Sequence, residues 1–536
     1  MVEPMSCGQA LVRLLEHYDV DTVFGIPGTH TLELYRGLAR SRIRHVQPRH
    51  EQGAGFMADG YARVSGRPGV CFLIAGPGLL NAATAIAQAY SDSIPMLVIS
   101  SVGAGSASGI PEGQIHELPD QAATMGSITG FAATAMSPGD VPDLIARGFA
   151  SFRNERPRPV HIALPLDVMA MDAAWPVPAA PAPAGVVAPD PATLAQAAAM
   201  LRQAERPLII LGGGGIDSGE AVIAIAENIG APVITTIAAK GAVPDDHPLH
   251  CGALLTTPVA RRIVADADVV LALGTELAAS DTWDAPLAFA GRLIRIDIDT
   301  AALRSHPSAE LILRADLATA LRSLIDILSA DGRVRDCCGV NDMATACRAE
   351  ARVPRSELQQ RHVRALEALR SAIPDDAFVA ADMAQVAYTA NVAFRCLRPR
   401  SYFYPVGLST LGYALPAAIG GKLAAPERAA IALVGDGGFL FTAAELGTAV
   451  QWGLPIVVLL WNNDGYGQIR DRMTARNIPP IGVNPRNPDF LALARSFGCR
   501  TARPASVAGL KREIRAALHR QVPTVIEIHD DGAWLA

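Results

Sequence analysis

Two polar motifs, each directly after an apolar run, could together bind a divalent cation. The run at 430–434 leads into Gly435-Asp436-Gly437-Gly438, and the run at 456–460 leads into Asn462-Asn463. Because neighbouring parallel strands end at the same edge of a sheet, where ligands bind, we expect Asp436 and Asn463 to lie side by side. Their carboxylate and amide oxygens, with a backbone carbonyl from Gly465, make half of the octahedral oxygen shell typical of Mg²⁺. A diphosphate and water would complete that shell.

The segment after Asp436 also favours an anion. A helix that begins there offers the N–H groups of its first turn, and Gly437 and Gly438 let the backbone approach a ligand closely. A Gly-Asp-Gly turn alone is weak evidence, since a plain tight turn explains it equally well. The combination with paired asparagines, each motif ending an apolar run, is far more specific.

A second carboxylate, Glu51, precedes a stretch of small and apolar residues at 53–58. We expect this acid to be partly desolvated, which favours the sharing of a proton. The alternative is an ordinary glutamate at a helix start, stabilised by the helix dipole. Glu51 taken alone does not decide between the two.

Short β-branched runs alternate with alanine-rich helical stretches along the whole chain. This alternation is typical of parallel α/β sheets covered on both faces. A proline-rich connector at 175–191 and a polar one without helical period at 330–355 separate the parts. We therefore predict three doubly wound parallel-sheet domains, at 1–172, 190–330 and 355–536. The strand runs are 70–75, 96–100, 208–211, 269–273, 293–298, 430–434 and 456–460.

The first and third predicted domains contain similar units. The run at 70–75 leads into Gly76-Pro77-Gly78, a helix, Ile94-Pro95 and another strand. The run at 430–434 leads into the Asp436 turn, a helix, Leu454-Pro455 and another strand. Two copies of one unit explain this likeness. The general similarity of all strand-helix-strand units is the alternative.

Composition excludes several classes of function. The net charge of −6 argues against a general nucleic-acid binder. Half of the residues are hydrophobic, enough to form large cores. Eight cysteines form no C-x-x-C pair, which fits reduced thiols in a cytoplasmic protein. We see no secretory signal and no apolar run of membrane-spanning length, so we expect no membrane partner.

The segment GDGGFLFTAAELGTAVQWGLPIVVLLWNN resembles the thiamine diphosphate signature of the acetolactate synthase, benzoylformate decarboxylase and pyruvate decarboxylase superfamily. The resemblance covers nearly the whole chain. It implies a pyrimidine-binding domain, a central Rossmann-like domain and a domain that binds the diphosphate and Mg²⁺. It also implies a homodimer or homotetramer with active sites at subunit interfaces. Further segments that resemble the family are FGIPGTH, RHEQGAGFMADGYAR, RPRPVHIALPLDV, LGGGGIDSG, LIRIDID and GLSTLGYALPAAIG.

The resemblance assigns roles to individual residues. Glu51 matches the catalytic glutamate that hydrogen-bonds the aminopyrimidine ring. Leu411 matches a large apolar residue beneath the bent cofactor, and Ser409 would offer its backbone carbonyl. The metal ligands would be Asp436, Asn463 and Gly465. The implied cofactor-binding set is Gly28, Glu51, Ser409, Leu411, Gly435, Asp436, Gly437, Gly438, Asn463, Gly465 and Tyr466.

Three polar residues are candidates for proton handling. Thr29 and His30 follow the Gly28 turn, where related decarboxylases carry a polar group that faces the substrate; a helix N-cap is the alternative role for Thr29. His116 stands where acetolactate synthases usually carry glutamine. This departure puts synthase specificity in doubt, because a histidine there could supply the proton that ends a simple decarboxylation.

The resemblance implies non-oxidative decarboxylation of a 2-oxo acid. HTLELYRGL and RHEQGAGFMADGYARVSG look closest to enzymes of arginine catabolism that convert 5-guanidino-2-oxopentanoate to 4-guanidinobutanal. A carboligase that makes acetolactate from pyruvate is the alternative. A non-catalytic relative is disfavoured, because Glu51, Asp436 and Asn463 are all present. A guanidinium tail needs an acidic partner, and the candidates are Glu112, Glu117, Asp120 and Asp464.

The glycine run 212–215 follows a predicted strand, as a nucleotide-binding turn would. A lone glycine-rich turn is weak evidence, and a plain flexible turn explains it. Related synthases hold FAD in this domain, whereas many decarboxylases hold ADP or nothing. We leave FAD open and do not favour it.

Overall fold

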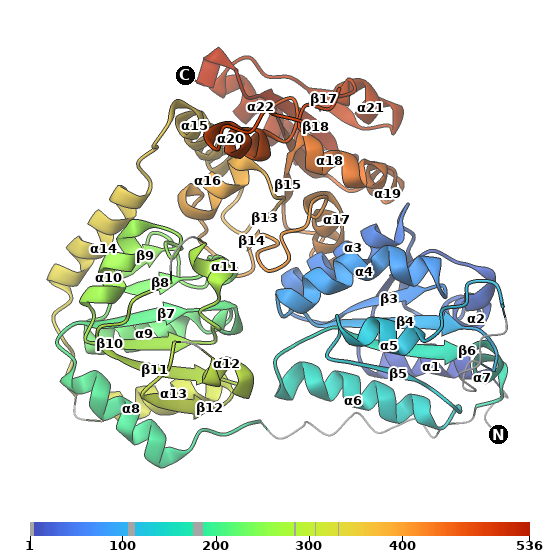
Figure 1. Ribbon diagram of the computed structural model, residues 1–536, viewed down its shortest axis with the longest axis horizontal. Coiled ribbons are helices and arrows are strands. Elements are labelled where there is room, and N and C mark those ends of the chain that lie inside the picture. The colour runs from blue at the N-terminus through green and yellow to red at the C-terminus, as the bar shows by residue number, and fades with distance from the viewer. Residues whose placement is uncertain are drawn as a thin grey trace.

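The computed structural model describes residues 5–105, 113–173, 175, 186–283, 286–305, 307–330 and 332–535. These residues form three six-stranded sheets. All strand pairs within the sheets are parallel. Figure 1 shows helices on both sides of each sheet. The predicted α/β class with three parallel sheets is confirmed.

The first sheet has the strand order β2-β1-β3-β4-β6-β5. Its strands are β1 (Thr22–Gly25), β2 (Arg44–Val46), β3 (Gly69–Leu73), β4 (Met96–Val102), β5 (Phe131–Thr134) and β6 (Val160–Pro165). The helices around it are α1 (Cys7–His17), η1 (Thr29–Thr31), α2 (Leu32–Leu38), α3 (Glu51–Ser65), α4 (Pro77–Ser91), α5 (Gln121–Gly126), α6 (Asp140–Asn154) and α7 (Leu166–Ala170).

The third sheet repeats this topology, with the order β14-β13-β15-β16-β18-β17. The predicted likeness of the two units therefore extends to the whole sheet. Its strands are β13 (Phe378–Ala381), β14 (Tyr402–Phe403), β15 (Ala430–Gly435), β16 (Ile456–Asn462), β17 (Arg500–Ala502) and β18 (Thr524–His529). Its helices are α15 (Glu357–Ala372), α16 (Gln385–Ala393), α17 (Ala414–Ala424), α18 (Asp436–Thr442), η5 (Ala443–Glu445), α19 (Leu446–Gln451), α20 (Gly467–Ala475), α21 (Phe490–Ser496), α22 (Val507–Ala517) and η6 (Ala533–Leu535).

The central sheet has the order β12-β11-β10-β7-β8-β9, which is the Rossmann order written from its other edge. Its strands are β7 (Pro207–Leu211), β8 (Val233–Thr235), β9 (His250–Gly252), β10 (Val269–Leu273), β11 (Arg292–Asp297) and β12 (Leu311–Arg314). Its helices are α8 (Pro191–Gln203), η3 (Gly213–Gly215), α9 (Gly219–Ile229), η4 (Ile237–Ala239), α10 (Pro258–Asp266), α11 (Ala279–Thr282), α12 (Thr300–Arg304), α13 (Leu317–Ser329) and α14 (Cys338–Ala351).

The first and third sheets share one continuous apolar core, built around the contact between α3 and α17. Figure 1 shows these two helices between the sheets. A Cβ atom on Gly60 would lie 2.0 Å from the carbonyl oxygen of Ala417, and one on Gly420 would lie 1.8 Å from that of Met57. Only glycine permits backbones to approach so closely. Glu51 therefore stands on a helix that is fixed firmly against the third domain.

The prediction of a polar connector without helical period at 330–355 is wrong in part, because α14 occupies the middle of this stretch. The helix packs on the central domain through a narrow stripe at helical spacing: Val340, Met343, Ala344 and Cys347. Small side chains make this period weak in the sequence. Helix α15 begins after this stretch with Ser356 as its N-cap, since the Ser356 side chain accepts a hydrogen bond from the N–H of Gln359. The Gln359 side chain in turn accepts a hydrogen bond from Arg355 N at 2.7 Å.

No helix in the described part of the chain has the length and apolar character that crossing a membrane requires. The cysteines in the described residues are all free thiols, as expected.

Candidate active site

The third sheet brings Asp436, Asn463 and Gly465 together at its carboxyl edge. β15 and β16 pair with Gly435 opposite Trp461, so the two strands end level. The Asn463 side-chain oxygen lies 2.7 Å from the carbonyl oxygen of Gly465 and 3.1 Å from Oδ1 of Asp436. No hydrogen lies between these oxygens, so they repel one another unless a cation lies among them.

A half-turn of the Asn463 amide would let its nitrogen donate to both of those oxygens, but its oxygen would then face Oε1 of Gln385 at 3.1 Å. A hard divalent cation such as Mg²⁺ removes the conflict without the rotation. The described residues contain no group of three His, Cys, Asp or Glu side chains arranged to hold a metal. A cation here would depend on one carboxylate, one amide and one carbonyl.

The backbone that follows Asp436 leaves no room for side chains. A Cβ atom on Gly437 would lie 2.9 Å from a ring carbon of Tyr466, and one on Gly438 would lie 2.8 Å from Oδ2 of Asp382. Gly435 is the N-cap of α18. The backbone at these three glycines and the ring of Tyr466 are therefore packed closely together beside the three oxygens.

Asp382, fully buried at the end of β13, was not among the predicted residues. It accepts hydrogen bonds from the N–H groups of Met383 and Gly412, at 2.8 and 3.0 Å. Burial raises the pKa of Asp382 to about 6. The carboxylate thus joins the Gly412 turn to Gly438. The signal that singled out Asp436, an acid after an apolar strand, could have found Asp382 too.

The loop that carries Ser409 and Leu411 is attached to α4 of the first domain. Gln88 Oε1 accepts from the Thr410 N–H, and Asp92 Oδ1 accepts from the Gly407 N–H at 2.7 Å. Ser409 has φ +59°, a conformation that non-glycine residues rarely adopt. Leu411 is half-buried. Contacts from both domains therefore hold this loop in one shape.

Glu51 begins α3 and is half-buried. Asn81 of α4 donates to its Oε2 at 2.9 Å. A Cβ atom on Gly78 would lie 3.3 Å from Glu51 Oε1. The neighbouring His50 acts as the N-cap of α3, accepting from Gln52 N, so its imidazole has a structural role.

The turn at Gly28 lies beside Glu51. Cβ atoms on Gly28 and Gly78 would both contact Ile74, at 2.5 and 2.6 Å. Thr31, not Thr29, closes the turn, since its Oγ1 bonds Gly28 N at 3.1 Å. Thr29 is exposed, and it caps neither η1 nor α2. The N-cap alternative for Thr29 is therefore wrong.

His30 and His116 meet at the same edge of the first sheet. Their rings lie edge to face, with centroids 5.2 Å apart. Burial and the nearby His116 lower the pKa of His30. Within the described residues, Nδ1 of His30 is buried and has no hydrogen-bond partner. His116 has φ +66°, and its backbone packs on Gly76.

Glu445, also missed by the sequence prediction, ties the third domain to the start of α3. Its carboxylate accepts from the N–H groups of Arg49 and His50 at 3.0 and 3.1 Å, and from Thr448 Oγ1 at 2.8 Å. Burial raises the pKa of Glu445. It therefore fixes the backbone that carries Glu51. No strand-end pattern marks this residue in the sequence.

The four candidate acids for a guanidinium tail differ in availability. Glu112 lies outside the described residues. Glu117 accepts from Gly113 N and Gln114 N, and Asp120 caps α5 through Ala123 N. Asp464 is exposed beside Gly465, and its carboxylate makes no hydrogen bond within the described residues.

The glycine run of the central domain packs on its own sheet. A Cβ atom on Gly212 would lie 2.2 Å from the Gly274 carbonyl oxygen, and that same oxygen accepts from the Gly214 N–H at 3.1 Å. Gly212 N donates to Leu273 O and Gly215 N to Gly212 O. Three N–H groups that a nucleotide phosphate would need are therefore already used.

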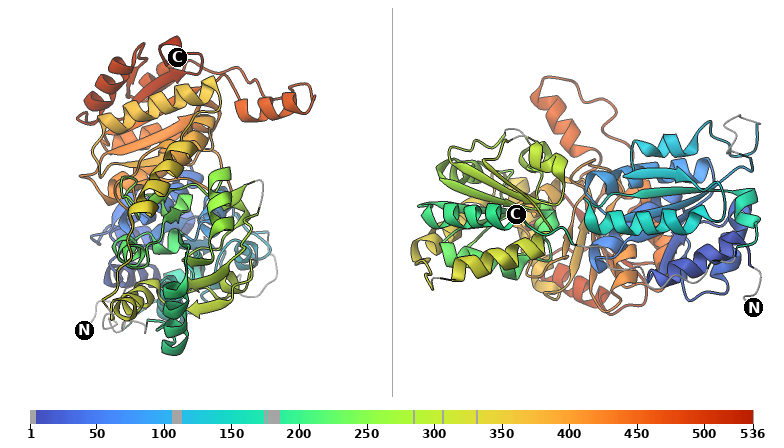
Figure 2. Two further views of the ribbon diagram at one scale, coloured as in Figure 1. Left: turned by 90° about the vertical axis from the view of Figure 1, so that its left-hand side faces the viewer. Right: turned by 90° about the horizontal axis from the view of Figure 1, so that it is seen from below.

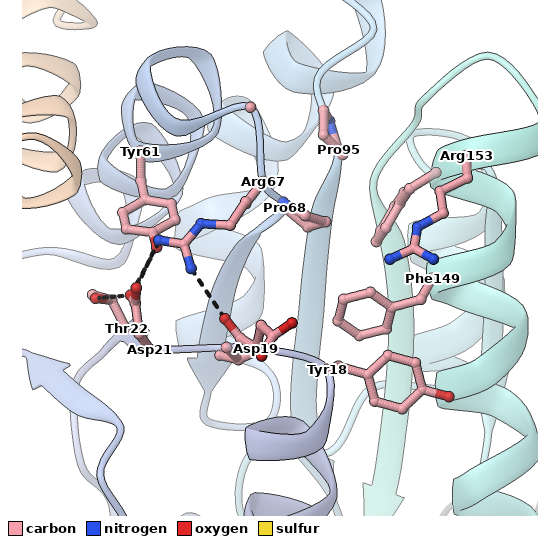
Figure 3. Close-up of a pocket in the computed structure, with 13 residues that line it drawn as sticks. Tyr18, Asp19, Asp21, Thr22, Tyr61, Arg67, Pro68, Pro95, Phe149 and Arg153 are labelled. Carbon is pink, nitrogen blue, oxygen red and sulfur yellow. Dashed lines mark hydrogen bonds and ion pairs between the residues drawn. The ribbon is translucent and has the colours of Figure 1, made fainter. Parts of the chain in front are cut away.

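A cavity of about 200 Å³ lies elsewhere, at the amino end of the first sheet. Tyr18, Asp21, Tyr61, Arg67 and Arg153 help to line it. Figure 3 shows Arg67 between Tyr61 and the Asp19–Asp21 turn, and its Nη2 bonds Asp21 Oδ2 at 2.6 Å. None of the predicted site residues lines this cavity.

The residues around Glu51 and those around Asp436 both lie in regions that match known proteins. Three models of thiamine pyrophosphate enzymes match the chain in order. The N-terminal TPP binding domain matches residues 5–124, the central domain 194–324 and the C-terminal TPP binding domain 382–528.

Curated relatives match along almost the whole chain. A Pseudomonas aeruginosa protein named "probable 2-ketoarginine decarboxylase" is 50% identical over 98% of this chain and 94% of its own. The acetolactate synthase large subunit of Corynebacterium glutamicum is 34% identical over 93% of this chain and 82% of its own. A probable acetolactate synthase large subunit of Methanocaldococcus jannaschii is 31% identical, over 99% and 92%.

Proposed function

Since this chain belongs to the thiamine pyrophosphate enzyme family, we propose that it decarboxylates 5-guanidino-2-oxopentanoate to 4-guanidinobutanal in arginine catabolism. The observation that carries the proposal is the 50% identity, over nearly the full length of both chains, to the P. aeruginosa protein. In the reaction the C1–C2 bond breaks, carbon dioxide leaves and a proton takes its place on C2.

The third domain would hold the cofactor's phosphate end. Oδ1 of Asp436, the amide oxygen of Asn463 and the carbonyl oxygen of Gly465 would bind Mg²⁺, which their convergence supports. Gly435, Gly437, Gly438 and Tyr466 would surround the diphosphate. When bound, thiamine diphosphate (the same compound as thiamine pyrophosphate) supplies the electron sink that decarboxylation needs.

The first domain would act on the other end of the cofactor. Glu51 would share a proton with the aminopyrimidine ring, and Asn81 orients the glutamate by donating to Oε2. Leu411 would pack against the cofactor, and the Ser409 carbonyl would accept a hydrogen bond from the amino group of its ring. Gly28, whose backbone packs closely on Ile74, would lie beside the ring.

The histidine pair would handle the product proton. His116, with His30 against it, would donate a proton to C2 after carbon dioxide has left. The lowered pKa of His30 keeps that neighbour neutral at pH 7, so it can accept or relay the proton. Thr29, exposed at the same turn, would face the substrate.

The guanidinium tail would bind Asp464. This carboxylate is exposed next to the metal-binding Gly465, whereas Glu117 and Asp120 already hold backbone N–H groups. A charge-assisted bond to guanidinium would favour this substrate over an uncharged 2-oxo acid of similar length.

Two chains would be needed for one active site. Large apolar side chains are exposed on the elements that carry the site residues, which supports burial against a second copy. They are Leu80, Leu408, Leu440, Phe441 and Ile469. Co-expression of Glu51→Gln with Asp436→Ala tests this. Sites formed between chains would recover about a quarter of the activity in a statistical mixture of C2 dimers; sites formed within one chain would recover none.

Carboligation is the second candidate, favoured by the acetolactate synthases among the relatives. His116 in place of their usual glutamine weighs against it. The purified protein, supplied with thiamine diphosphate and Mg²⁺, should release carbon dioxide fastest from 5-guanidino-2-oxopentanoate within a 2-oxo acid panel. No release from any member would refute decarboxylation, and acetolactate formed from pyruvate would favour the carboligase.

A further inference from the structure

We propose that Asn487 and Gln385 are positioning residues that turn the two side-chain ligands, Asp436 and Asn463, toward the cation. Neither residue was predicted to belong to the site. The inference rests on the proposed function, because it presupposes a divalent cation at this edge of the third sheet.

Asn487 orients Asp436. In the part of the chain that the structure describes, both hydrogen bonds to this carboxylate reach Oδ2, one from the Gly465 N–H at 2.8 Å and one from Asn487 Nδ2 at 2.7 Å. An ionised carboxylate only accepts hydrogen bonds, so the amide nitrogen of Asn487 must face it. Among the described residues, Oδ1 of Asp436 is thereby left without a donor, and it is this oxygen that lies 3.1 Å from the Asn463 oxygen.

Gln385 orients Asn463 in the same manner. Gln385 Nε2 donates to Oδ2 of Asp471 at 2.9 Å, which leaves its Oε1 facing Asn463. That oxygen accepts from Asn463 Nδ2 at 3.1 Å. Since Asp471 can only accept, the direction of the chain Asn463 to Gln385 to Asp471 is set. The Asn463 oxygen is therefore turned toward Asp436 and Gly465.

The two amides act from segments that are remote in the sequence. Gln385 begins α16 after β13, and Asn487 precedes α21. Each amide bonds the side-chain atom of Asp436 or Asn463 that faces away from the cation. Gln385 and Asn487 therefore limit the rotation of these two side chains without contacting the metal. Loss of such outer contacts typically costs 10–100-fold in metal affinity.

The test is direct binding of Mn²⁺, read from the electron paramagnetic resonance of the free ion, to full-length protein with saturating thiamine diphosphate. We expect Asn487→Ala and Gln385→Leu each to weaken Mn²⁺ binding by roughly 10–100-fold. Asn484→Ala is the matched control in the same loop. The Asn484 side chain is exposed and accepts a hydrogen bond from Arg470, and within the described residues it bonds neither Asp436 nor Asn463. The Mn²⁺ affinity of this variant should therefore equal that of the wild type.

A second readout separates positioning from general damage. Excess Mg²⁺ should restore the turnover of Asn487→Ala, which a merely structural defect would not allow. Mn²⁺ affinities within twofold of the control for both variants would overturn the inference while leaving the proposed function intact. A wild type that binds no Mn²⁺ would overturn both. Should Asn487→Ala fail to fold, Gln385→Leu alone decides.

Discussion

His30 and His116 contact each other edge to face, with ring centroids 5.2 Å apart, although His30 lies in η1 and His116 in the loop before α5. The protonation of one opposes that of the other, which contributes to the lowered pKa of His30. Such a pair can deliver one proton at a time, as the last step of a decarboxylation requires.

Replacement of His116 by glutamine should slow aldehyde formation by about 10²–10⁴, the usual contribution of acid–base catalysis. Binding of thiamine diphosphate should not change, because His116 does not belong to the proposed cofactor-binding set. Aldehyde release and equilibrium dialysis of the cofactor measure the two effects. An aldehyde yield equal to that of the wild type would remove His116 from the mechanism.

Glu51→Gln should keep cofactor binding and lower turnover by about 10²–10⁴. The amide fills the same space beside Asn81 but cannot share a proton as the acid does. Glu220→Gln is the control, because Glu220 also lies in the first turn of a helix but is exposed on the central domain. Turnover of both variants near the wild-type value would argue that Glu51 is an ordinary helix-start residue.

Glu445→Ala should lower both the free energy of unfolding and the rate of turnover. The N–H groups of Arg49 and His50 would lose their partner inside the protein, at a cost of about 1–3 kcal/mol. A small shift of Glu51 could lower turnover by up to about 10²-fold. Thermal unfolding and turnover at low temperature measure the effects. Glu445→Gln, which keeps one acceptor, should be milder; equal loss in both variants would contradict this explanation.

Acid should destabilise the fold through His161. Burial lowers its pKa to about 4, while an unfolded chain has a histidine pKa near 6.5. The unfolded state therefore binds more protons than the folded state between these two pH values. As the pH is lowered from about 6.5 to 4, the free energy of unfolding falls by roughly 3 kcal/mol for this group.

His161→Gln should reduce the loss in melting temperature between pH 7 and pH 5. His519→Gln, at an exposed position, should leave it unchanged. The same pH dependence in all three proteins would exclude His161 as a cause.

Asp464→Asn should lower kcat/KM for 5-guanidino-2-oxopentanoate by roughly 10–100-fold, since a hydrogen bond to a charged group contributes about 1.5–3 kcal/mol. The rate with 2-oxohexanoate, which has no guanidinium, should hardly change. Asp120→Asn serves as the control. If both substrates were affected alike, Asp464 would not be the partner of the tail.

Strand-end motifs predicted much of the fold and part of the candidate site. Apolar runs located the strands closely, as at Val269–Leu273, because strands buried on both faces leave little choice of residue. The same patterns do not reveal contacts between distant segments. Glu445, Asn487 and Gln385 act through backbone N–H groups or amides far away in the sequence, so tertiary packing alone brings them to the site. Helix α14 was missed because its apolar stripe is narrow and built partly of small residues.

The central claim is that Glu51 of the first domain and the residues around Asp436 of the third domain act on one cofactor. A crystal structure with thiamine diphosphate and Mg²⁺ tests this claim most directly. We expect the cation on Oδ1 of Asp436, the amide oxygen of Asn463 and the carbonyl oxygen of Gly465. The carboxyl group of Glu51, from a second copy of the chain, should bond the aminopyrimidine ring. A cation held by other residues, or a cofactor that no Glu51 reaches, would contradict the account.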